Sequence, residues 1–352
     1  MKLYAGHEFR YTYICHVLTK NINLKIMKKN LRNVLVLSLG LITTIASAQW
    51  SASSKSWIDN TNSDDRNGFT RSTVTLDMSG VHISGDHFWN TDGTTSQDLY
   101  EAYVSTDVMG FGTLTLGRQD LSFGSGVLIS SGNWGANRYT TDGMDFSMSL
   151  SGININAGTM GGINTDMNYI NASGEFAGVS INALMIDDND VKSNAYDLGY
   201  SMMNGDLNLS YTMADDGNNT EMTRIGVSYN VFENLSAHGH MTTYDGDSDP
   251  GTPFNAPNSA MSDGFAQGVM PHLTNGLEAL SYGISYDLGD IAFSYTMHTV
   301  SVTDDGGLPA ADDYDLTDIK ISYQLNDNCS IGYRAYKDQT DDVNFITVEL
   351  GL

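Results

Sequence analysis

Alternation of apolar and polar residues is the feature that most constrains what this chain can fold into. In residues 72–78, for example, apolar Val74 and Leu76 alternate with threonines. Successive side chains of a β-strand point to opposite faces, so a run of this kind predicts a strand with one apolar and one polar face. Similar short runs recur as far as the C-terminal segment 343–352. The chain is therefore expected to be all-β.

Short turns and longer polar loops alternate between these runs. Asn204-Gly205 is the clearest turn, because the central residues of a tight hairpin turn adopt positive φ, which Asn and Gly tolerate. Outer-membrane barrels combine short periplasmic turns with long extracellular loops, so this rhythm predicts a transmembrane antiparallel up-and-down β-barrel. With a first strand over 50–58, the pattern indicates about 18 strands, and about 16 is the alternative. The predicted short turns are 79–80, 109–111, 177–178, 204–205, 231–234, 289–290 and 326–328.

A soluble β-sandwich is the alternative fold, because it also buries one face of each sheet and shows similar local alternation. The regular exchange of short and long connections favours the barrel. The alternation at the C-terminal end, which continues to Leu352, favours it as well.

The N-terminal region differs from the rest of the chain. Residues 27–48 have the layout of a secretory signal peptide, with a basic start, a short apolar run and an Ala-Ser-Ala ending. Residues 1–26 show no targeting pattern, and we interpret them as an upstream extension or a start site assigned too early. We therefore expect residues 49–352 to form a barrel in the outer membrane of a Gram-negative bacterium.

The predicted mature chain is strongly acidic. Seven of the 17 Lys and Arg and one of the 42 Asp and Glu precede residue 49, which leaves 10 basic and 41 acidic side chains and a net charge of −31. Such a surface repels nucleic-acid phosphates, so nucleic acid is not an expected partner. Expected partners are outer-membrane lipid and lipopolysaccharide, the barrel-assembly machinery and small hydrophilic solutes. Cys329 is the one cysteine after residue 48, so no internal disulfide is expected.

Charged residues at the polar positions of the strands are candidates for the interior lining. If the apolar positions face lipid, the opposite positions face the lumen. The set contains four basic and five acidic side chains, which predicts a lining of mixed charge. Its members are Arg71, Asp77, Glu101, Asp145, Asp197, Arg224, Asp318, Lys320 and Arg334.

The loop over residues 120–142 is the candidate constriction of the lumen. It is rich in Gly and Ser and has few acids, whereas the other long loops are dense in Asp. A loop that departs from the general charge pattern is expected to fold inward, although an ordinary surface loop is the alternative. The candidate constriction residues are Arg118, Asp120, Trp134 and Arg138.

Arg118 has the parity of Leu116, which would point it at lipid. Three interpretations are open. A bulge at Gly117 turns the side chain inward, the residue lies at the extracellular rim, or Arg118 pairs with Asp120 or Asp142 and anchors the loop.

Two stretches of the sequence have residues of the types that bind metal ions. Residues 245–251 resemble the start of a calcium-binding loop, but Pro250 stands where that turn needs Gly. His238 and His240 share one strand face, but no third ligand is evident. A solvated acidic loop and polar filling of the lumen are the default interpretations. We expect no metal, no cofactor and no catalytic residues, and therefore no enzyme.

Residues 116–126, Asn133-Trp134 and Asp142-Gly143 together resemble a stretch of the alginate-export family of outer-membrane barrels, whose Bacteroidota members are described as porins. The resemblance implies an 18-stranded barrel that passes anionic polysaccharide or small solutes. A polyuronate conduit needs a strongly positive lining, and the predicted lining is mixed. Passive diffusion of small hydrophilic solutes or saccharides is therefore the main prediction. The alternatives are export of an alginate-like polysaccharide and a structural or adhesive barrel with acidic surface loops.

Overall fold

A computed structural model describes one part of the chain, and two compact units are distinguished, Met1–Gln49 and Trp50–Leu352. The predicted signal peptide and the segment before it lie outside the described residues. Among the residues that the structure describes, no helix has the length and hydrophobicity needed to cross a membrane. The described residues are 49–59, 68–131, 138–161, 167–189, 191–256, 259, 273–303, 313–337 and 342–351.

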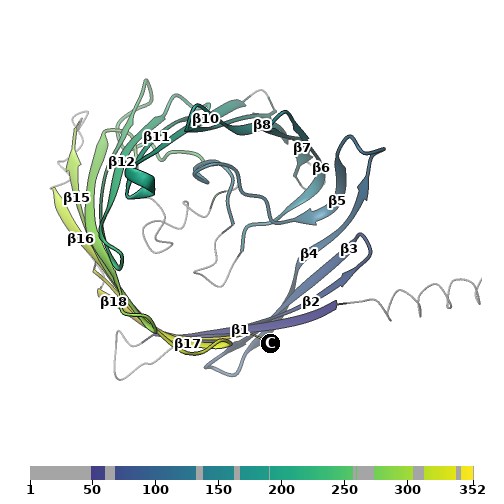
Figure 1. Cartoon of the computed structure of the whole chain (residues 1–352), viewed down its shortest axis with the longest axis horizontal. Helices are drawn as coiled ribbons and strands as arrows, with labels where there is room; N and C mark the ends of the chain where they lie inside the picture. The colour runs from purple at the N-terminus through teal and green to yellow at the C-terminus, as the bar shows by residue number, and fades with distance from the viewer. Residues whose placement is uncertain are drawn as a thin grey trace, which may run out of the picture. The chain divides into compact units, whose positions relative to one another are not determined.

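The described chain forms one sheet of 18 antiparallel strands, in which each strand pairs with its neighbours in the sequence. Pairing of β1 with β18, from Ser53 opposite Gly351 to Asp59 opposite Phe345, closes the sheet into a ring (Figure 1). The prediction of a closed antiparallel barrel with about 18 strands is confirmed. The strands are β1 (Gln49–Asp59), β2 (Gly68–Met78), β3 (Val81–Asn90), β4 (Thr95–Asp107), β5 (Thr113–Gln119), β6 (Thr141–Leu150), β7 (Ile153–Met160), β8 (Met167–Phe176), β9 (Val179–Asp188), β10 (Val191–Met202), β11 (Leu207–Asp215), β12 (Glu221–Phe232), β13 (Leu235–Asp245), β14 (Leu277–Asp287), β15 (Ile291–Val302), β16 (Tyr314–Asn326), β17 (Cys329–Lys337) and β18 (Asp342–Gly351).

The barrel wall has two chemically different faces. On the outer face large apolar side chains are exposed, as at Ile225 (58%) and Met185 (52%). On the inner face the positions that alternate with them are buried, as at Thr242 and Ala279, both 0% exposed. An apolar exterior is what a barrel in lipid requires, because the backbone polar groups are already paired within the sheet.

Tight turns close the hairpins at one end of the barrel. The predicted Asn204-Gly205 turn forms the short 3-10 helix η1 (Met203–Gly205), with φ of 61° at Asn204 and 95° at Gly205. These left-handed values explain why Asn and Gly occupy the turn. By the general rule for outer-membrane barrels, this short-turn end is the periplasmic end.

One irregularity in the wall matters for the interior. The β3–β4 ladder changes register between Ser84, which pairs with Glu101, and Gly85, which pairs with Leu99. A bulge of this kind re-aims side chains. As a result two adjacent residues, Tyr100 and Glu101, both contact Asp120 at the start of the β5–β6 loop. The Tyr100 hydroxyl donates to the Asp120 carboxylate, and the Glu101 carboxylate accepts from the Asp120 N–H.

The hydrophobic core lies inside the barrel rather than between two sheets. It forms where inward side chains of the wall meet loop residues that enter the lumen, and Figure 1 shows the coil that follows β5 inside the ring of strands. The buried members are Val127, Leu128, Ile129, Met160, Met167, Tyr169, Leu184, Ile186, Ala195, Ala214, Met222, Tyr244, Phe254, Leu273, Ala279, Val300 and Leu316.

Candidate functional site

The β5–β6 loop lies inside the barrel and narrows the lumen. Val127, Leu128 and Ile129 are at most 1% exposed and belong to the core described above. Burial of three consecutive apolar residues stabilises the inward conformation, at roughly 1.5–3 kcal/mol for each fully buried large side chain. Across the lumen, the backbone N–H of Ser125 donates to Asp197 of β10 at 3.0 Å. The loop is therefore attached to the wall five strands away from its start.

Both ends of this loop meet at Tyr100 of β4. The Tyr100 hydroxyl donates to the Asp120 carboxylate at the start of the loop. At the end of the loop, the Arg138 guanidinium lies 3.9 Å from the centroid of the Tyr100 ring. Arg138 also donates to Thr73 at 2.6 Å and lies 3.5 Å from Asp86. These contacts hold Asp120 and Arg138 at the lumen wall, while Trp134 lies outside the described residues.

The β13–β14 loop also enters the lumen. Phe254 is 1% exposed and packs edge-on against Tyr244, with ring centroids 5.6 Å apart. The Ser259 hydroxyl donates to the carbonyl of Gly126 at 2.6 Å, which joins the two loops. The carboxylate of Asp216, 0% exposed, accepts from the backbone N–H of residue 255 at 2.9 Å.

A solvated acidic loop was the default interpretation of residues 245–251, and Asp245, Asp247 and Asp249 are exposed. The sequence did not predict that this second loop enters the lumen beyond them. Its acid content concealed the two apolar residues that carry it inward, Phe254 and Leu273, which are 1% and 5% exposed. An aromatic residue inside an acidic loop was the available signal.

The lysine and arginine side chains of the strands are segregated around the ring, whereas inward acids such as Asp318 and Glu349 accompany them. On β12–β18, β1 and β2, which we call the basic arc, the inward positions include five cations. On β3–β11, the acidic arc, Arg118 and Lys192 are the two Lys or Arg in the strands, and both have outward parity. The inward cations of the basic arc are Lys55, Arg71, Arg224, Lys320 and Arg334.

The acidic arc carries inward carboxylates that are bound to neighbouring groups. Asp145 accepts from the Tyr169 hydroxyl at 2.6 Å. Asp197 accepts from Thr212 at 2.7 Å and from Asn182 at 3.3 Å, as well as from the loop. The carboxylates of this arc thus hold wall and loop together. A cavity of about 750 Å³ lies between this arc and the start of the β5–β6 loop.

Within the basic arc, Asp318 lies between two cations. Arg334 binds it through two parallel hydrogen bonds, Nε to Oδ1 at 2.9 Å and Nη2 to Oδ2 at 2.8 Å. The ammonium of Lys320 lies 3.2 Å from the same carboxylate. Arg334 is 3% exposed, whereas the Lys320 side chain is 44% exposed. Asp318 therefore neutralises the buried guanidinium and leaves Lys320 accessible.

A second part of the basic arc surrounds Trp57 of β1. The cationic groups of Lys55 and Arg71 each lie 5.2 Å from the Trp57 ring centroid, a distance suited to cation–π attraction. Lys55 also pairs with Glu349 of β18. A cavity of about 520 Å³ is lined by Lys55, Arg71 and Arg138. Sequence reasoning omitted Lys55, because alternation in the serine-rich first strand is weak.

The remaining predicted lining residues lie at the edges of the two arcs. Asp77 is close to the short turn after β2, and its carboxylate contacts His82 at 2.6 Å. The other ring nitrogen of His82 lies 3.3 Å from Glu101. Arg224 pairs in register with Thr212 and Thr242, so it stands where the acidic arc meets the basic arc.

Arg118 does not belong to the constriction. It has the parity of Leu116, which pairs in register with Met144, and these two outward side chains are 48% and 40% exposed. The guanidinium binds Asp142 through two hydrogen bonds of 2.9 Å and donates to the carbonyl of Leu99 at 3.1 Å. Gly117 has a φ of 129°, yet the parity of the strand is kept, so no bulge turns Arg118 inward. The ion pair with Asp142 braces the outer rim of the hairpin.

The two candidate metal motifs do not assemble into a metal site. The rings of His238 and His240 lie 5.7 Å apart, and His238 shares a hydrogen bond of 3.2 Å with Thr296. In the described ranges, no group of three His, Cys, Asp or Glu side chains is placed to hold a metal ion.

Comparison with known proteins identifies the family. The family model described as Gram-negative porin matches residues 36–352. The chain belongs to the Gram-negative porin family. It is thus an outer-membrane channel for diffusion of small solutes, surrounded by lipid and lipopolysaccharide, and this confirms the predicted location and channel function. This match gives no support to the predicted resemblance to the alginate-export family.

Solved structures of Pseudomonas aeruginosa channels share the fold of this porin. OpdK, solved with vanillate, has a TM-score of 0.69 at 11% identity, covering 87% of this chain and 98% of that chain. OccK2 (OpdF), solved in complex with glucuronate, has a TM-score of 0.67 at 12% identity, with the same coverage. OprD has a TM-score of 0.64 at 11% identity, covering 86% and 92%. A search of curated protein sequences finds no match.

Proposed function

We propose that this porin favours small solutes that carry a carboxylate. The observation that carries the proposal is the segregation of lumenal cations on the basic arc, beside the narrowing made by the β5–β6 loop. A charge in a narrow, low-dielectric channel interacts more strongly with a solute than the same charge in water does. A solute carboxylate that follows the basic arc exchanges part of its hydration for contacts with accessible cations.

Three further observations support this proposal. The cavity beside Lys55, Arg71 and Arg138 is of the size that small-molecule sites have, roughly 300–1,000 Å³. The structurally similar OccK2 and OpdK were solved with glucuronate and vanillate, both of which carry a carboxylate. The acidic arc uses its carboxylates in internal hydrogen bonds, which leaves them less available to a cationic solute.

Swelling of liposomes that contain the purified porin tests the proposal. Glucuronate, glucose and glucosamine share one sugar ring and differ in net charge. We expect influx to be fastest for glucuronate, slower for glucose and slowest for glucosamine, with liposomes lacking the porin as the control. Faster entry of glucosamine than of glucuronate contradicts the proposal. Absence of swelling with all three sugars supports the structural or adhesive alternative instead.

Export of an alginate-like polysaccharide has less support. The basic arc is the observation in its favour, but two loops pack inside the lumen and join at the contact of Ser259 with Gly126. A polymer needs a continuous wide path, so we place small solutes first. Exclusion of neutral polymers of graded size in conductance measurements separates the two.

We also propose that the chain reaches its membrane by the usual route for such barrels. This route comprises export with residues 27–48 as a cleaved signal peptide and insertion by the barrel-assembly machinery. We assign no catalytic step, cofactor or metal to the channel. Sequencing the N-terminus of the mature protein tests the cleavage, and Gln49 is the expected first residue.

A further inference from the structure

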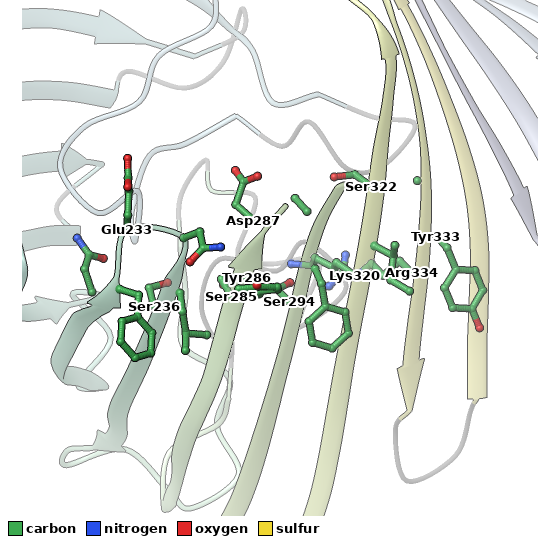
Figure 2. A pocket seen from close by; sticks show the side chains of 18 of the residues that line it. Glu233, Ser236, Ser285, Tyr286, Asp287, Ser294, Lys320, Ser322, Tyr333 and Arg334 are labelled. Carbon is green, nitrogen blue, oxygen red and sulfur yellow. The ribbon is translucent and has the colours of Figure 1, made fainter. Parts of the chain in front are cut away.

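A row of serines leads to the accessible lysine of the basic arc. Strand register places Ser236 opposite Ser285, Ser285 opposite Ser294, and Ser294 opposite Lys320. The same row continues to Arg334, and Figure 2 shows these side chains along one line of the wall. Neighbouring strands are about 4.8 Å apart, so the three steps from Ser236 to Lys320 cover roughly 14 Å.

This row lines a cavity of about 500 Å³ at the short-turn side of the lumen (Figure 2). Its lining includes the turn residues Glu233 and Asn234, Asp287 at the end of β14, and the two cations Lys320 and Arg334. The cavity is separate from the cavity lined by Lys55, and none of its lining residues belongs to either loop inside the barrel.

Of the two cations that follow the serines in this row, Lys320 is the accessible one. Arg334 is occupied by Asp318 through two hydrogen bonds, and its side chain is 3% exposed. Lys320 is 44% exposed and has one contact with Asp318 at 3.2 Å. An ammonium group carries three donors, so Lys320 has donors left for a second anion.

The serine row differs from the polar residues of the opposite wall. On the acidic arc, Asn171, Asn182 and Asp197 are joined by hydrogen bonds of 2.7 and 3.3 Å. Across the part of the chain that the structure describes, no hydrogen bond joins the side chains of the serine row to one another or to Lys320. A hydroxyl both donates and accepts, so a row of half-buried hydroxyls suits a partner with several hydroxyl groups.

We propose that Ser236, Ser285, Ser294 and Lys320 form a periplasmic-side binding subsite for a polyhydroxylated carboxylate, a sugar acid. Lys320 pairs with the carboxylate, and the serines exchange hydrogen bonds with the solute hydroxyls. This rests on the proposed preference for carboxylates and adds to it a preference for hydroxyl-bearing acids. The row holds the solute between the narrow region and the short-turn end.

Interruption of potassium chloride current through single channels tests the subsite. Gluconate is the probe, and hexanoate, a carboxylate of the same chain length without hydroxyls, is its matched control. In the wild type we expect gluconate to reach half-block at a lower concentration than hexanoate. In Ser285→Ala/Ser294→Ala, the half-block concentration of gluconate should rise about five-fold, as expected for two lost hydrogen bonds, while that of hexanoate stays unchanged.

Two further variants complete the test. Lys320→Gln should raise the half-block concentration about ten-fold for both acids, because the charge-assisted contact is common to them. Ser147→Ala/Ser173→Ala removes two inward hydroxyls from the acidic arc and should leave the half-block concentrations of both acids unchanged. A far-UV circular dichroism spectrum in detergent that matches the wild type shows that each variant is folded.

The outcomes separate the subsite from the proposed function. If Ser285→Ala/Ser294→Ala changes the half-block concentrations of both acids equally, or of neither, the subsite is overturned. Liposome swelling can still show a carboxylate preference in that case. If the wild type shows no preference for glucuronate in swelling and neither acid interrupts the current, the proposed function itself fails.

Discussion

The acidic arc and the basic arc are built from the same kind of strand but serve different purposes. On the acidic arc, Asp197 and Asp145 bind the loop and the wall, and core residues such as Leu184 pack against Leu128 and its neighbours. On the basic arc, Lys320 and Lys55 line cavities. Both arcs contribute to the buried core, and the acidic arc borders a cavity of its own, but the accessible lysines line the cavities of the basic arc. A solute carboxylate is therefore expected to meet its cationic partners on the basic arc. The number of charged residues in the lumen does not by itself predict the selectivity of such a channel, because the position of each charge decides whether a solute can contact it.

The division has a chemical reason. A loop that enters the lumen brings backbone N–H groups that need acceptors, and a carboxylate is a strong acceptor, whereas lysine and arginine have no acceptor atoms. Asp197 accepts from Ser125 N–H, Asp216 accepts from the backbone of residue 255, and Glu101 accepts from the N–H of Asp120. Acidic residues thus accept the backbone N–H groups of the loops, and an accessible cation such as Lys320 remains for the solute.

The largest effect on conductance is expected from deletion within the β5–β6 loop, which is bound to the acidic arc. Deletion of residues 125–137 removes the buried segment Val127–Ile129 and should raise single-channel conductance several-fold in planar bilayers. Shortening the exposed connection between β3 and β4 at residues 91–94 is the control and should leave conductance unchanged. Unchanged conductance in the 125–137 deletion would show that the constriction lies elsewhere.

Reversing one cation tests whether the basic arc sets the selectivity. Lys320→Glu places a negative charge at an accessible position, so the reversal potential in a salt gradient should move toward cation selectivity and glucuronate influx should fall several-fold. Lys192→Glu makes the same charge change on the outward face of the acidic arc and should have little effect. Equal effects of the two variants would mean that total charge, rather than its location, governs selectivity.

Asp318 is the acid of the basic arc that binds a buried guanidinium through two hydrogen bonds, and its removal should affect stability. Asp318→Ala leaves Arg334, which is 3% exposed, without its bidentate partner, so we expect a loss of about 3–5 kcal/mol in the free energy of unfolding. Urea unfolding in detergent micelles measures this loss. Asp315→Ala on the outward side of the same strand is the control, and the expected change is within about 0.5 kcal/mol. A negligible effect of Asp318→Ala would show that the neighbouring residues compensate the charge.

The smallest effect is expected at Arg118, on the outer face of the acidic arc. Its ion pair with Asp142 is partly exposed, with side-chain exposures of 32% and 52%. Pairs of this kind contribute about 0–1 kcal/mol, so Arg118→Ala should lower stability by no more than that. Conductance and reversal potential should not change. A changed conductance would place Arg118 in the ion path and contradict its outward orientation.

Strand boundaries illustrate where sequence reasoning was limited. Apolar and polar residues alternate clearly over 319–325, whereas β16 extends from Tyr314 to Asn326. Outside the hydrocarbon region a strand needs no apolar face, so pairing continues where alternation is lost. The bulge at Tyr100 on β4 was missed as well. An extra residue in a strand leaves no periodic signal when it and the next residue, Glu101, can both occupy a polar face.

By itself the sequence determined a closed two-faced barrel of about 18 strands, with about 16 as the alternative, and the face on which most charged side chains of the strands lie. These features depend on local alternation and turn chemistry. The sequence also marked the loop that enters the lumen. Tertiary structure decided which charges share one side of the lumen, that a second loop joins the first, and that Arg118 braces the rim. Position around a closed ring depends on the pairing of all 18 strands, and contacts across the lumen join residues far apart in the chain. A pattern with a period of two residues carries no information about either.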